Sequence, residues 1–370
     1  MPEARNSPAT TQGTAPAAPG AVKPAPKQAA PPRLSTALLA ASSITLSFGL
    51  AYALHLERPY WAGIAAMVLS QSAVGQSLQK GLWRMAGTVA GAAAGMAVLA
   101  CFGEARLSLL LACGVLLAVL VMFMRGSSYS YFYYSTALMA VLSVAQSHGE
   151  APFRMACARM EENLAGIAAY TLCALCLRPA SASRELVGLG GVWLGVFEEL
   201  LRLPAEERVR EILRDKFLAG VQSFAALAFI AFLWQELAPA GTESALFIEI
   251  ASLLVLLGFM TGRFAAWELL FSMAAGVALA VWLYCVAMPG LDGFAGLGAV
   301  IFALSFGMAW AFPLPEQGMA RMGLLMPVFV LSGMGGEHFD PQGVLSGGVG
   351  LLCAALAVTL VFSLSGRGNG

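Results

Sequence analysis

The sequence has few charged residues: Asp, Glu, Lys and Arg make up only 11% of its 370 residues, whereas an average soluble domain has about 25%. Apolar residues account for 59% of the chain, and the mean hydropathy is +0.75. This composition excludes a soluble globular enzyme and a disordered regulator. The 21 basic and 21 acidic residues cancel, so the chain has no net positive charge to attract a nucleic acid.

Several enzyme signatures are also missing. The sequence contains only three histidines and no GxxxxGK[ST], HExxH or GxSxG motif, so we expect no phosphate-binding loop, zinc protease or serine hydrolase. Cys173 and Cys176 form a CxxC pair inside an apolar stretch. Because no second ligand pair is near, we interpret them as small buried apolar residues. We therefore expect neither an enzyme nor a bound metal or cofactor.

Long apolar runs are abundant. A helix that crosses the hydrocarbon core of a bilayer needs about 20 apolar residues, and Gly, Pro and charged residues separate the runs here. We predict an all-α polytopic membrane protein with twelve transmembrane helices, at about 34–54, 60–77, 82–101, 107–124, 131–147, 155–177, 217–235, 244–262, 265–288, 294–312, 319–336 and 344–364.

The segments between these runs divide the chain. Residues 1–33 contain eight prolines and almost no large apolar residue, which predicts a disordered tail rather than a signal peptide. Residues 34–177 and 217–364 are then two six-helix bundles. The charged segment 178–216 is predicted to be a short amphipathic linker, either a plain solvated connector or a regulatory element. Residues 365–370 form a C-terminal tail.

The basic residues predict the orientation of the chain. With the N-terminus inside, 17 of the 21 Lys and Arg residues fall in cytoplasmic segments, which favours cytoplasmic N- and C-termini. A short internal match aligns Trp83–Thr88 with Trp267–Ser272. Because each half would begin inside, we predict two parallel six-helix repeats.

The span at 155–177 opens with the densest group of polar residues. On a helix, Arg159, Glu162 and Asn163 share one face at i, i+3 and i+4. Such a face could bind an anionic substrate beside a protonatable acid, or it could be a self-contained Arg–Glu pair that orients the helix. Glu249, within a second apolar run, is another candidate proton site, unless it pairs with a residue of a neighbouring helix.

Further candidate substrate contacts lie in three other spans. Arg84 is either a charge that sets topology or a cytoplasmic anion site. Ser70 and Gln71 belong to a polar stretch that suits an unwound, ligand-binding helix or hydrogen bonds between helices. Tyr131 lies in an aromatic run that forms either an interfacial belt or a stacking surface for an aromatic substrate.

Glycines recur in the span that contains Arg84. Gly87, Gly91 and Gly95 are spaced every fourth residue, so they lie on one face of a helix. Small residues at this spacing let two helix backbones approach closely. We therefore predict that this face packs against a neighbouring helix and does not line a pathway.

Motifs in the second, third and sixth spans resemble the fusaric acid resistance protein-like family, which includes aromatic acid exporters and is related to plant aluminium-activated malate transporters. The resemblance covers about residues 37–180. It is carried by Pro59-Tyr60-Trp61-Ala62, Ser70-Gln71, Leu82-Trp83-Arg84-x-x-Gly87-Thr88-x-x-Gly91, Arg159-x-x-Glu162-x-x-x-Gly166 and Arg178-Pro179.

The resemblance implies proton-motive-force-driven export of aromatic or other organic carboxylates across a bacterial inner membrane. Arg84 and Arg159 would attract the carboxylate at opposite faces of the membrane, and Glu162 or Glu249 would carry the coupling proton. The expected partners are a small organic anion, the lipid bilayer and a second copy in a homodimer. Long members of the family carry a large cytosolic domain between the bundles, which this chain lacks. The alternatives are a passive organic-anion channel and a non-transporting membrane scaffold.

Overall fold

The structure is a computed structural model, and it describes residues 33–70, 77–103, 106–125, 127, 129–145, 152–178, 216–229, 250–256, 258, 266–291, 293–313, 317–333 and 341–364. Within these residues all regular structure is helical. Three predicted segments lie outside the described residues: the tail at 1–33, except Arg33, nearly all of the linker at 178–216, and the C-terminal tail at 365–370.

The helices of the first part of the chain follow the predicted spans closely. They are α1 (Arg33–Ala53), α2 (Pro59–Ser70), α3 (Ser77–Phe102), α4 (Arg106–Met124), α5 (Ser130–Ala145) and α6 (Pro152–Leu177). Helix α2 is described as far as Ser70, and residues 71–76 of the predicted span lie outside the described residues.

From residue 266 on, the helices also begin and end near the predicted positions. Described helical segments lie at Lys216–Phe229 and 250–256. They are followed by α10 (Ala266–Trp282), α11 (Gly293–Ala311), α12 (Gly318–Gly333) and α13 (Pro341–Leu364). The backbone of α10 continues through a π-helical turn at Leu283–Ala287 into a 3-10 turn at Met288–Gly290.

Five of the described helices are long and apolar enough to cross a membrane: Arg33–Ala53, Gly81–Phe102, Trp267–Gly290, Gly293–Ala311 and Gln342–Ser363. The apolar helices Pro59–Ser70, Ser108–Met124, Lys216–Phe229 and Gly318–Leu331 are shorter. Large apolar side chains also lie on the outer surface, where the side chain of Phe271 is 70% exposed. A surface of this kind is suited to lipid.

The glycines of α3 lie against α5, in agreement with the expected packing face. A Cβ atom at Gly87 would lie 2.7 Å from the carbonyl oxygen of Phe132, and one at Gly95 would lie 2.7 Å from Cβ of Ser143. Contacts this short leave no room for a side chain, so only glycine permits the two backbones to approach as they do. The pair α3–α5 is therefore held together along most of its length.

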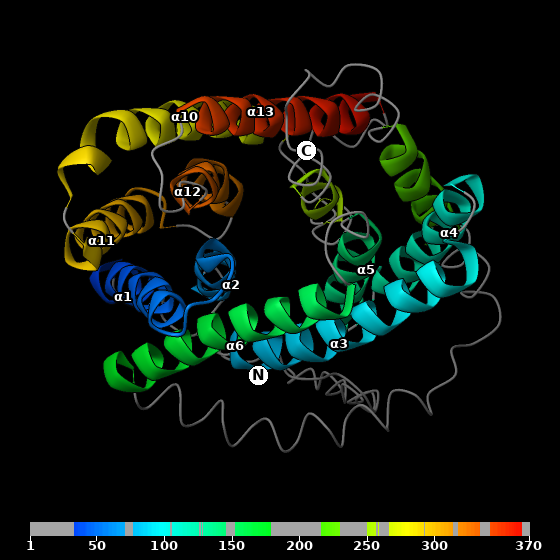
Figure 1. Cartoon of the computed structure of the whole chain (residues 1–370), viewed down its shortest axis with the longest axis horizontal. Helices are drawn as coiled ribbons and strands as arrows, with labels where there is room; N and C mark the ends of the chain where they lie inside the picture. Colours follow the sequence, from blue (N-terminus) through cyan, green and yellow to red (C-terminus); the bar gives the residue numbers. More distant parts are fainter. Residues whose placement is uncertain are drawn as a thin grey trace, which may run out of the picture. The chain divides into compact units, whose positions relative to one another are not determined.

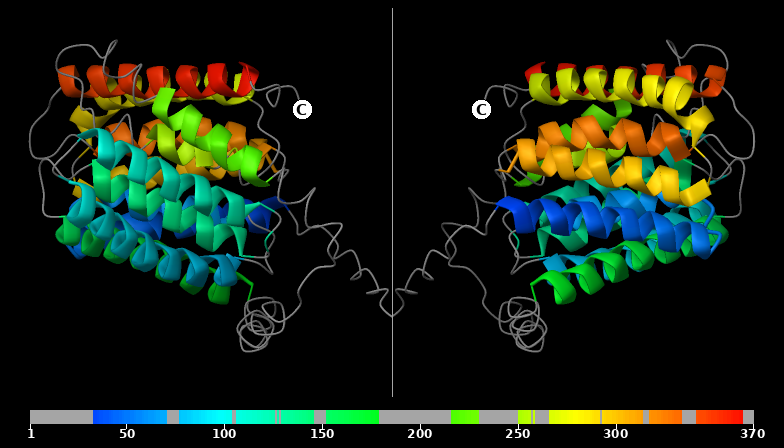
Figure 2. Two further views of the ribbon diagram at one scale, coloured as in Figure 1. Left: turned by 90° about the vertical axis from the view of Figure 1, so that its right-hand side faces the viewer. Right: turned by 90° about the vertical axis from the view of Figure 1, so that its left-hand side faces the viewer.

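Helix α1 joins the two parts of the chain. It packs against α2, α6 and α11, and α2 in turn contacts α12. Figure 1 shows α1 beside α11 and α2 beside α12, and the right-hand view of Figure 2 shows α1 lying between α6 and α11. In the second part, α10 packs against both α12 and α13.

Candidate functional site

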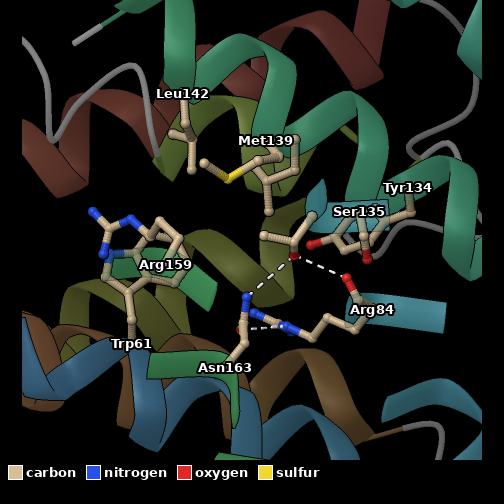
Figure 3. Close-up of a pocket in the computed structure, with 10 residues that line it drawn as sticks. Trp61, Arg84, Tyr134, Ser135, Met139, Leu142, Arg159 and Asn163 are labelled. Atoms are coloured by element: carbon tan, nitrogen blue, oxygen red, sulfur yellow. Dashed lines mark hydrogen bonds between the residues drawn. The ribbon is translucent and has the colours of Figure 1, made fainter. Parts of the chain in front are cut away.

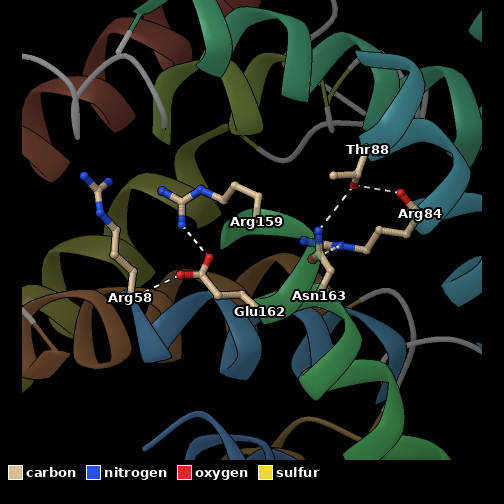
Figure 4. Close-up of polar contacts among 6 residues, drawn as sticks. All are labelled: Arg58, Arg84, Thr88, Arg159, Glu162 and Asn163. Atoms are coloured by element: carbon tan, nitrogen blue, oxygen red, sulfur yellow. Dashed lines mark hydrogen bonds and ion pairs between the residues drawn. The ribbon is translucent and has the colours of Figure 1, made fainter. Parts of the chain in front are cut away.

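The most polar part of the described core lies where α6 meets α2 and α3 (Figure 4). Helix α6 places Arg159, Glu162 and Asn163 on one face, as the i, i+3, i+4 spacing predicts. These side chains are almost completely buried, with exposed fractions of 4%, 1% and 7%, and Arg84 of α3 is 5% exposed. Charged groups buried to this extent in an apolar bundle need partners close by.

Glu162 links α6 to the beginning of α2. Its Oε2 lies 2.7 Å from an Nη atom of Arg159, and its Oε1 accepts a hydrogen bond of 3.0 Å from the backbone N–H of Arg58. The guanidinium of Arg159 also stacks over the ring of Trp61, 4.6 Å from the ring centroid. A salt bridge and a cation–π contact together compensate for the burial of this cation.

Asn163 links α6 to α3. Its Oδ1 accepts a hydrogen bond of 2.7 Å from Nε of Arg84, and its Nδ2 donates one of 3.3 Å to Oγ1 of Thr88. Thr88 itself donates to the carbonyl oxygen of Arg84 at 2.8 Å. Arg84 also donates from an Nη atom to the hydroxyl of Tyr131 at 3.2 Å. These contacts fix the orientation of the amide and of the guanidinium.

A small cavity lies between the two arginines (Figure 3). Its volume is about 20 Å³, which is room for one water molecule. Leu138, Met139 and Leu142 of α5 form its apolar wall. Figure 3 shows Arg84 and Arg159 on the other side of the cavity from Met139 and Leu142. The lining residues include Trp61, whose Nε1 makes no hydrogen bond to any described residue, and Ser135, whose Oγ makes none either.

The model of the fusaric acid resistance protein family matches residues 33–231, just over half of the chain. The chain belongs to the fusaric acid resistance protein family. The matched region contains α1 to α6 and therefore every residue that lines the cavity between the two arginines. No curated protein and no solved structure matches the chain.

Membership of the fusaric acid resistance protein family, together with the long apolar helices, identifies a membrane protein. The family also suggests a function in membrane transport or efflux. Among the described residues, no group of three or more His, Cys, Asp or Glu side chains is placed to hold a metal ion. The seven cysteines all lie in the described segments and form no disulfide with one another. The interpretation of the CxxC pair as buried residues is wrong for Cys176, which is exposed, and Cys173 is only partly buried.

The structure corrects two expectations for this family member. Arg84 and Arg159 do not lie at opposite faces of the membrane, because both line one cavity and Asn163, which bonds to Arg84, follows Arg159 by one helical turn. The interfacial belt is also wrong for Tyr131 and Tyr134. Both side chains are buried in the bundle, and their rings stack with centroids 5.6 Å apart.

The other predicted site residues are distributed as follows. Asn163 lines the cavity with the two arginines, and Glu162 is paired to Arg159 beside it. Ser70 is the last residue of α2 and lines a different cavity. Gln71 and Glu249 lie outside the described residues.

Sequence reasoning missed two residues of the site, Trp61 and Thr88. Both belong to the motifs that carry the family resemblance, so their positions were visible in the sequence. Their roles were not visible, because each depends on a contact with α6, which is distant in the sequence.

Proposed function

We propose that the protein exports aromatic or other organic carboxylates across a bacterial inner membrane, driven by the proton motive force. The observation that carries this proposal is that two buried arginines line one cavity inside an apolar bundle of a family associated with efflux. A guanidinium binds a carboxylate through two parallel hydrogen bonds. The donors of Trp61 and Ser135, which have no partner in the described part of the chain, are suited to the same ligand.

Arg84 and Arg159 differ in how readily they can accept a substrate. Arg84 already donates to Asn163 and to Tyr131, both of which are neutral. Arg84 therefore keeps its full positive charge available to an incoming anion. Arg159 is neutralised by Glu162 at 2.7 Å, so a substrate carboxylate has to compete with that side chain. We therefore assign first contact with the anion to Arg84 and the regulated contact to Arg159.

Glu162 is the group that we propose to bind and release the proton that controls the contact between Arg159 and the substrate. When it binds a proton, Arg159 loses its anionic partner and becomes available to the substrate. Proton binding and anion binding therefore favour each other. If the proton then returns to the side from which it came, the anion crosses alone. A negative interior expels an anion with about 2.3 kcal/mol per charge for each 100 mV, and the membrane potential is a component of the proton motive force.

The size of the cavity implies a conformational change during transport. Its volume is about 20 Å³, and an aromatic acid is several times larger than the single water molecule that fits this volume. The walls of the cavity therefore have to separate before a substrate can enter. Carriers with a central site move in this way when they alternate access between the two sides of the membrane.

For the whole chain we propose twelve transmembrane helices in two parallel repeats, with both termini in the cytoplasm. In support, the starts of α10, α11, α12 and α13 follow those of α3, α4, α5 and α6 at a nearly constant interval along the sequence. Gly276 of α10 lies against the backbone of α12 much as Gly87 of α3 lies against α5. This interval is about one helical turn longer than the one that separates Trp83 from Trp267 in the short sequence match.

The test is efflux of a labelled hydroxybenzoate from membrane vesicles. We expect Arg84→Gln and Arg159→Gln to lower the rate by about tenfold or more, because each removes a charge-assisted contact with the carboxylate. Arg154→Gln on the same helix is the matched control, since its side chain is 71% exposed and pairs with Glu57 at the surface. Wild-type rates in both buried variants would refute the proposal.

A carrier and a passive anion channel are distinguished in the same vesicles by counterflow. Unlabelled substrate on one side accelerates movement of the label through a carrier, because the loaded site returns faster than the empty one. A channel shows no such acceleration and gives steady currents in patch recordings. Counterflow that is absent, together with such currents, would replace export by a carrier with conduction by a channel.

A further inference from the structure

A second buried arginine site lies where α1 and α2 meet α11 and α12. Arg321 of α12 lines a cavity of about 10 Å³ together with Ser305 of α11 and Ser70 of α2, and the other lining residues are apolar. Arg321 is 5% exposed and Ser305 is 1% exposed. The sequence alone assigned Arg321 only to the set of cytoplasmic charges that fix the orientation.

Two polar atoms at this cavity lack partners. Nε of Arg321 donates no hydrogen bond, and Oγ of Ser305 makes none, to any residue that the structure describes. A buried donor left unpaired costs about 1–3 kcal/mol, and more when the group is charged. Both atoms belong to residues of one small cavity, so one bound species can satisfy both of them.

The charge of Arg321 decides what that species is. Within the described part of the chain, no acidic residue lines the cavity and no carboxylate forms an ion pair with Arg321. A water molecule could accept from Nε, but it would leave the positive charge buried and uncompensated. An anion satisfies the hydrogen bonds and the charge together.

We propose that Arg321 and Ser305 form an anion-binding site for a single monovalent anion, either a chloride ion or the carboxylate group of an organic acid. The guanidinium supplies charge and donors, and the serine hydroxyl supplies one further donor. Met67 and Leu325 form part of the wall. The flexible Met67 side chain can move to admit an ion larger than the present volume.

This site is separate from the cavity between Arg84 and Arg159. It lies at the other end of α2, because Trp61 lines the first cavity and Ser70 lines the second. These residues are nine positions apart, or about 13 Å along the helix. Arg321 and Ser305 also lie beyond residues 33–231, the region matched by the family. The anion site therefore does not depend on the proposed export.

The experiment measures thermal unfolding of the purified full-length protein in detergent at constant ionic strength. Gluconate, whose carboxylate is attached to a polyhydroxylated chain that does not suit the apolar wall of the cavity, is replaced stepwise by chloride in one series and by benzoate in another. A ligand that binds only the folded state raises the unfolding temperature as its concentration rises. We expect this rise with at least one of the two anions for the wild type and for the surface variant Arg154→Gln.

The Arg321→Gln variant should lose this anion-dependent rise, and Ser305→Ala should need about tenfold more anion for the same rise, since it loses one donor. Arg321→Lys keeps the charge and should retain part of the response if Arg321→Gln fails to fold. A wild type without any anion response, or an Arg321→Gln variant whose response equals that of the wild type, would overturn the proposal.

Two controls distinguish chloride from a carboxylate as the ligand, and the Arg321 site from the cavity between Arg84 and Arg159. A rise with chloride that Arg84→Gln and Arg159→Gln retain belongs to the Arg321 site. A rise with benzoate that only these two variants lose belongs to the first cavity and leaves chloride as the ligand of Arg321. Failure of export in vesicles would leave both results unchanged, because the unfolding measurement requires no transport.

Discussion

Glu162 receives its two hydrogen bonds from different parts of the fold, one from Arg159 on its own helix and one from the backbone of Arg58 before α2. Removing a charged group from water costs several kcal/mol per ion. A buried pair is retained at such a cost only where the contacts around it are complete. Here the ring of Trp61 covers one face of the Arg159 guanidinium, 4.6 Å from the ring centroid.

The Arg159–Glu162 pair should therefore show strong coupling in a double-mutant cycle. We expect Arg159→Gln or Glu162→Gln alone to lower the free energy of unfolding by about 3–5 kcal/mol, because each leaves one buried charge without its partner. The double variant should lose less than the sum of the two. The measurement is denaturant unfolding in detergent micelles, with Glu57→Gln as the exposed control, for which about 0–1 kcal/mol is expected. Additive single effects would contradict the coupling.

We expect Asn163 to orient the side chain of Arg84, not to keep helix α6 in its place in the bundle. Asn163→Leu keeps the volume of the side chain but removes the acceptor of the Arg84 Nε–H and the donor to Thr88. We expect efflux to fall by about tenfold and the free energy of unfolding to fall by about 1–3 kcal/mol. The matched control is Thr171→Val on the same helix, whose hydroxyl bonds to the carbonyl oxygen of Ile167. Equal efflux in both variants would exclude a positioning role for Asn163.

At the scale of elements, the pair α3–α5 depends on glycine. Gly87→Val would place a methyl group against the backbone of Phe132, and Gly95→Val would do the same at Ala140. Overpacking of this kind typically lowers the free energy of unfolding by about 1–3 kcal/mol. It would also displace α5, which forms the apolar wall of the cavity. We expect lower unfolding temperatures and lower yields of folded protein for both variants.

Gly307→Ala in α11 is the control for this series, because a Cβ atom at this position would have nothing within 4 Å. Alanine is favoured over glycine in a helix by about 1 kcal/mol, so this variant should be as stable as the wild type or more stable. A loss of stability as large as that of Gly87→Val would show that glycine is needed for a reason other than close packing.

The elements were predictable from the sequence because each depends on local signals. Apolar runs predict the helices. The regular spacing of Gly87, Gly91 and Gly95 predicts which face of α3 packs against a neighbouring helix. The i, i+3, i+4 arrangement on α6 also follows from one helix alone. The meeting of Arg84 with Asn163 does not, because it depends on how α3 packs against α6. The burial of Arg321 was unpredictable for the same reason, since it results from several helices that converge on it.

At the scale of the whole molecule, the two parts of the chain do not carry equivalent chemistry. The first contains the cavity with Arg84 and Arg159, whereas Met273 and Gly348 stand at the corresponding positions of the second when the starts of the helices are aligned. Among the described residues, Arg321 is the buried cation of the second part. Among its described residues, the second part therefore contains no second copy of the site with Arg84 and Arg159.

The proposed use of the membrane potential makes a prediction for the intact transporter. Valinomycin with balanced potassium removes the potential, and we expect it to lower efflux of a monovalent carboxylate by about tenfold, since about 1.4 kcal/mol corresponds to a factor of ten. Nigericin, which removes the pH gradient, should leave efflux nearly unchanged. The opposite result, with nigericin alone abolishing efflux, would show that protons are exchanged for the anion.

Glu162→Gln adds a second measurement to the same experiment. Glutamine cannot ionise, so Arg159 stays without an anionic partner at every pH. Efflux by this variant should keep its dependence on the membrane potential and lose its dependence on pH. A variant that keeps the pH dependence of the wild type would move the proton to another group.

The glycine face of α3, which lets this helix approach α5 closely, has a mechanical consequence. Two helices whose backbones touch over successive turns move as one rigid body, because sliding or parting them would break many short contacts at once. The cavity between the arginines must then widen on its opposite side, by a swing of α6 together with the start of α2. Glu162 bonds to both of these segments, so such a swing would carry its contacts along intact.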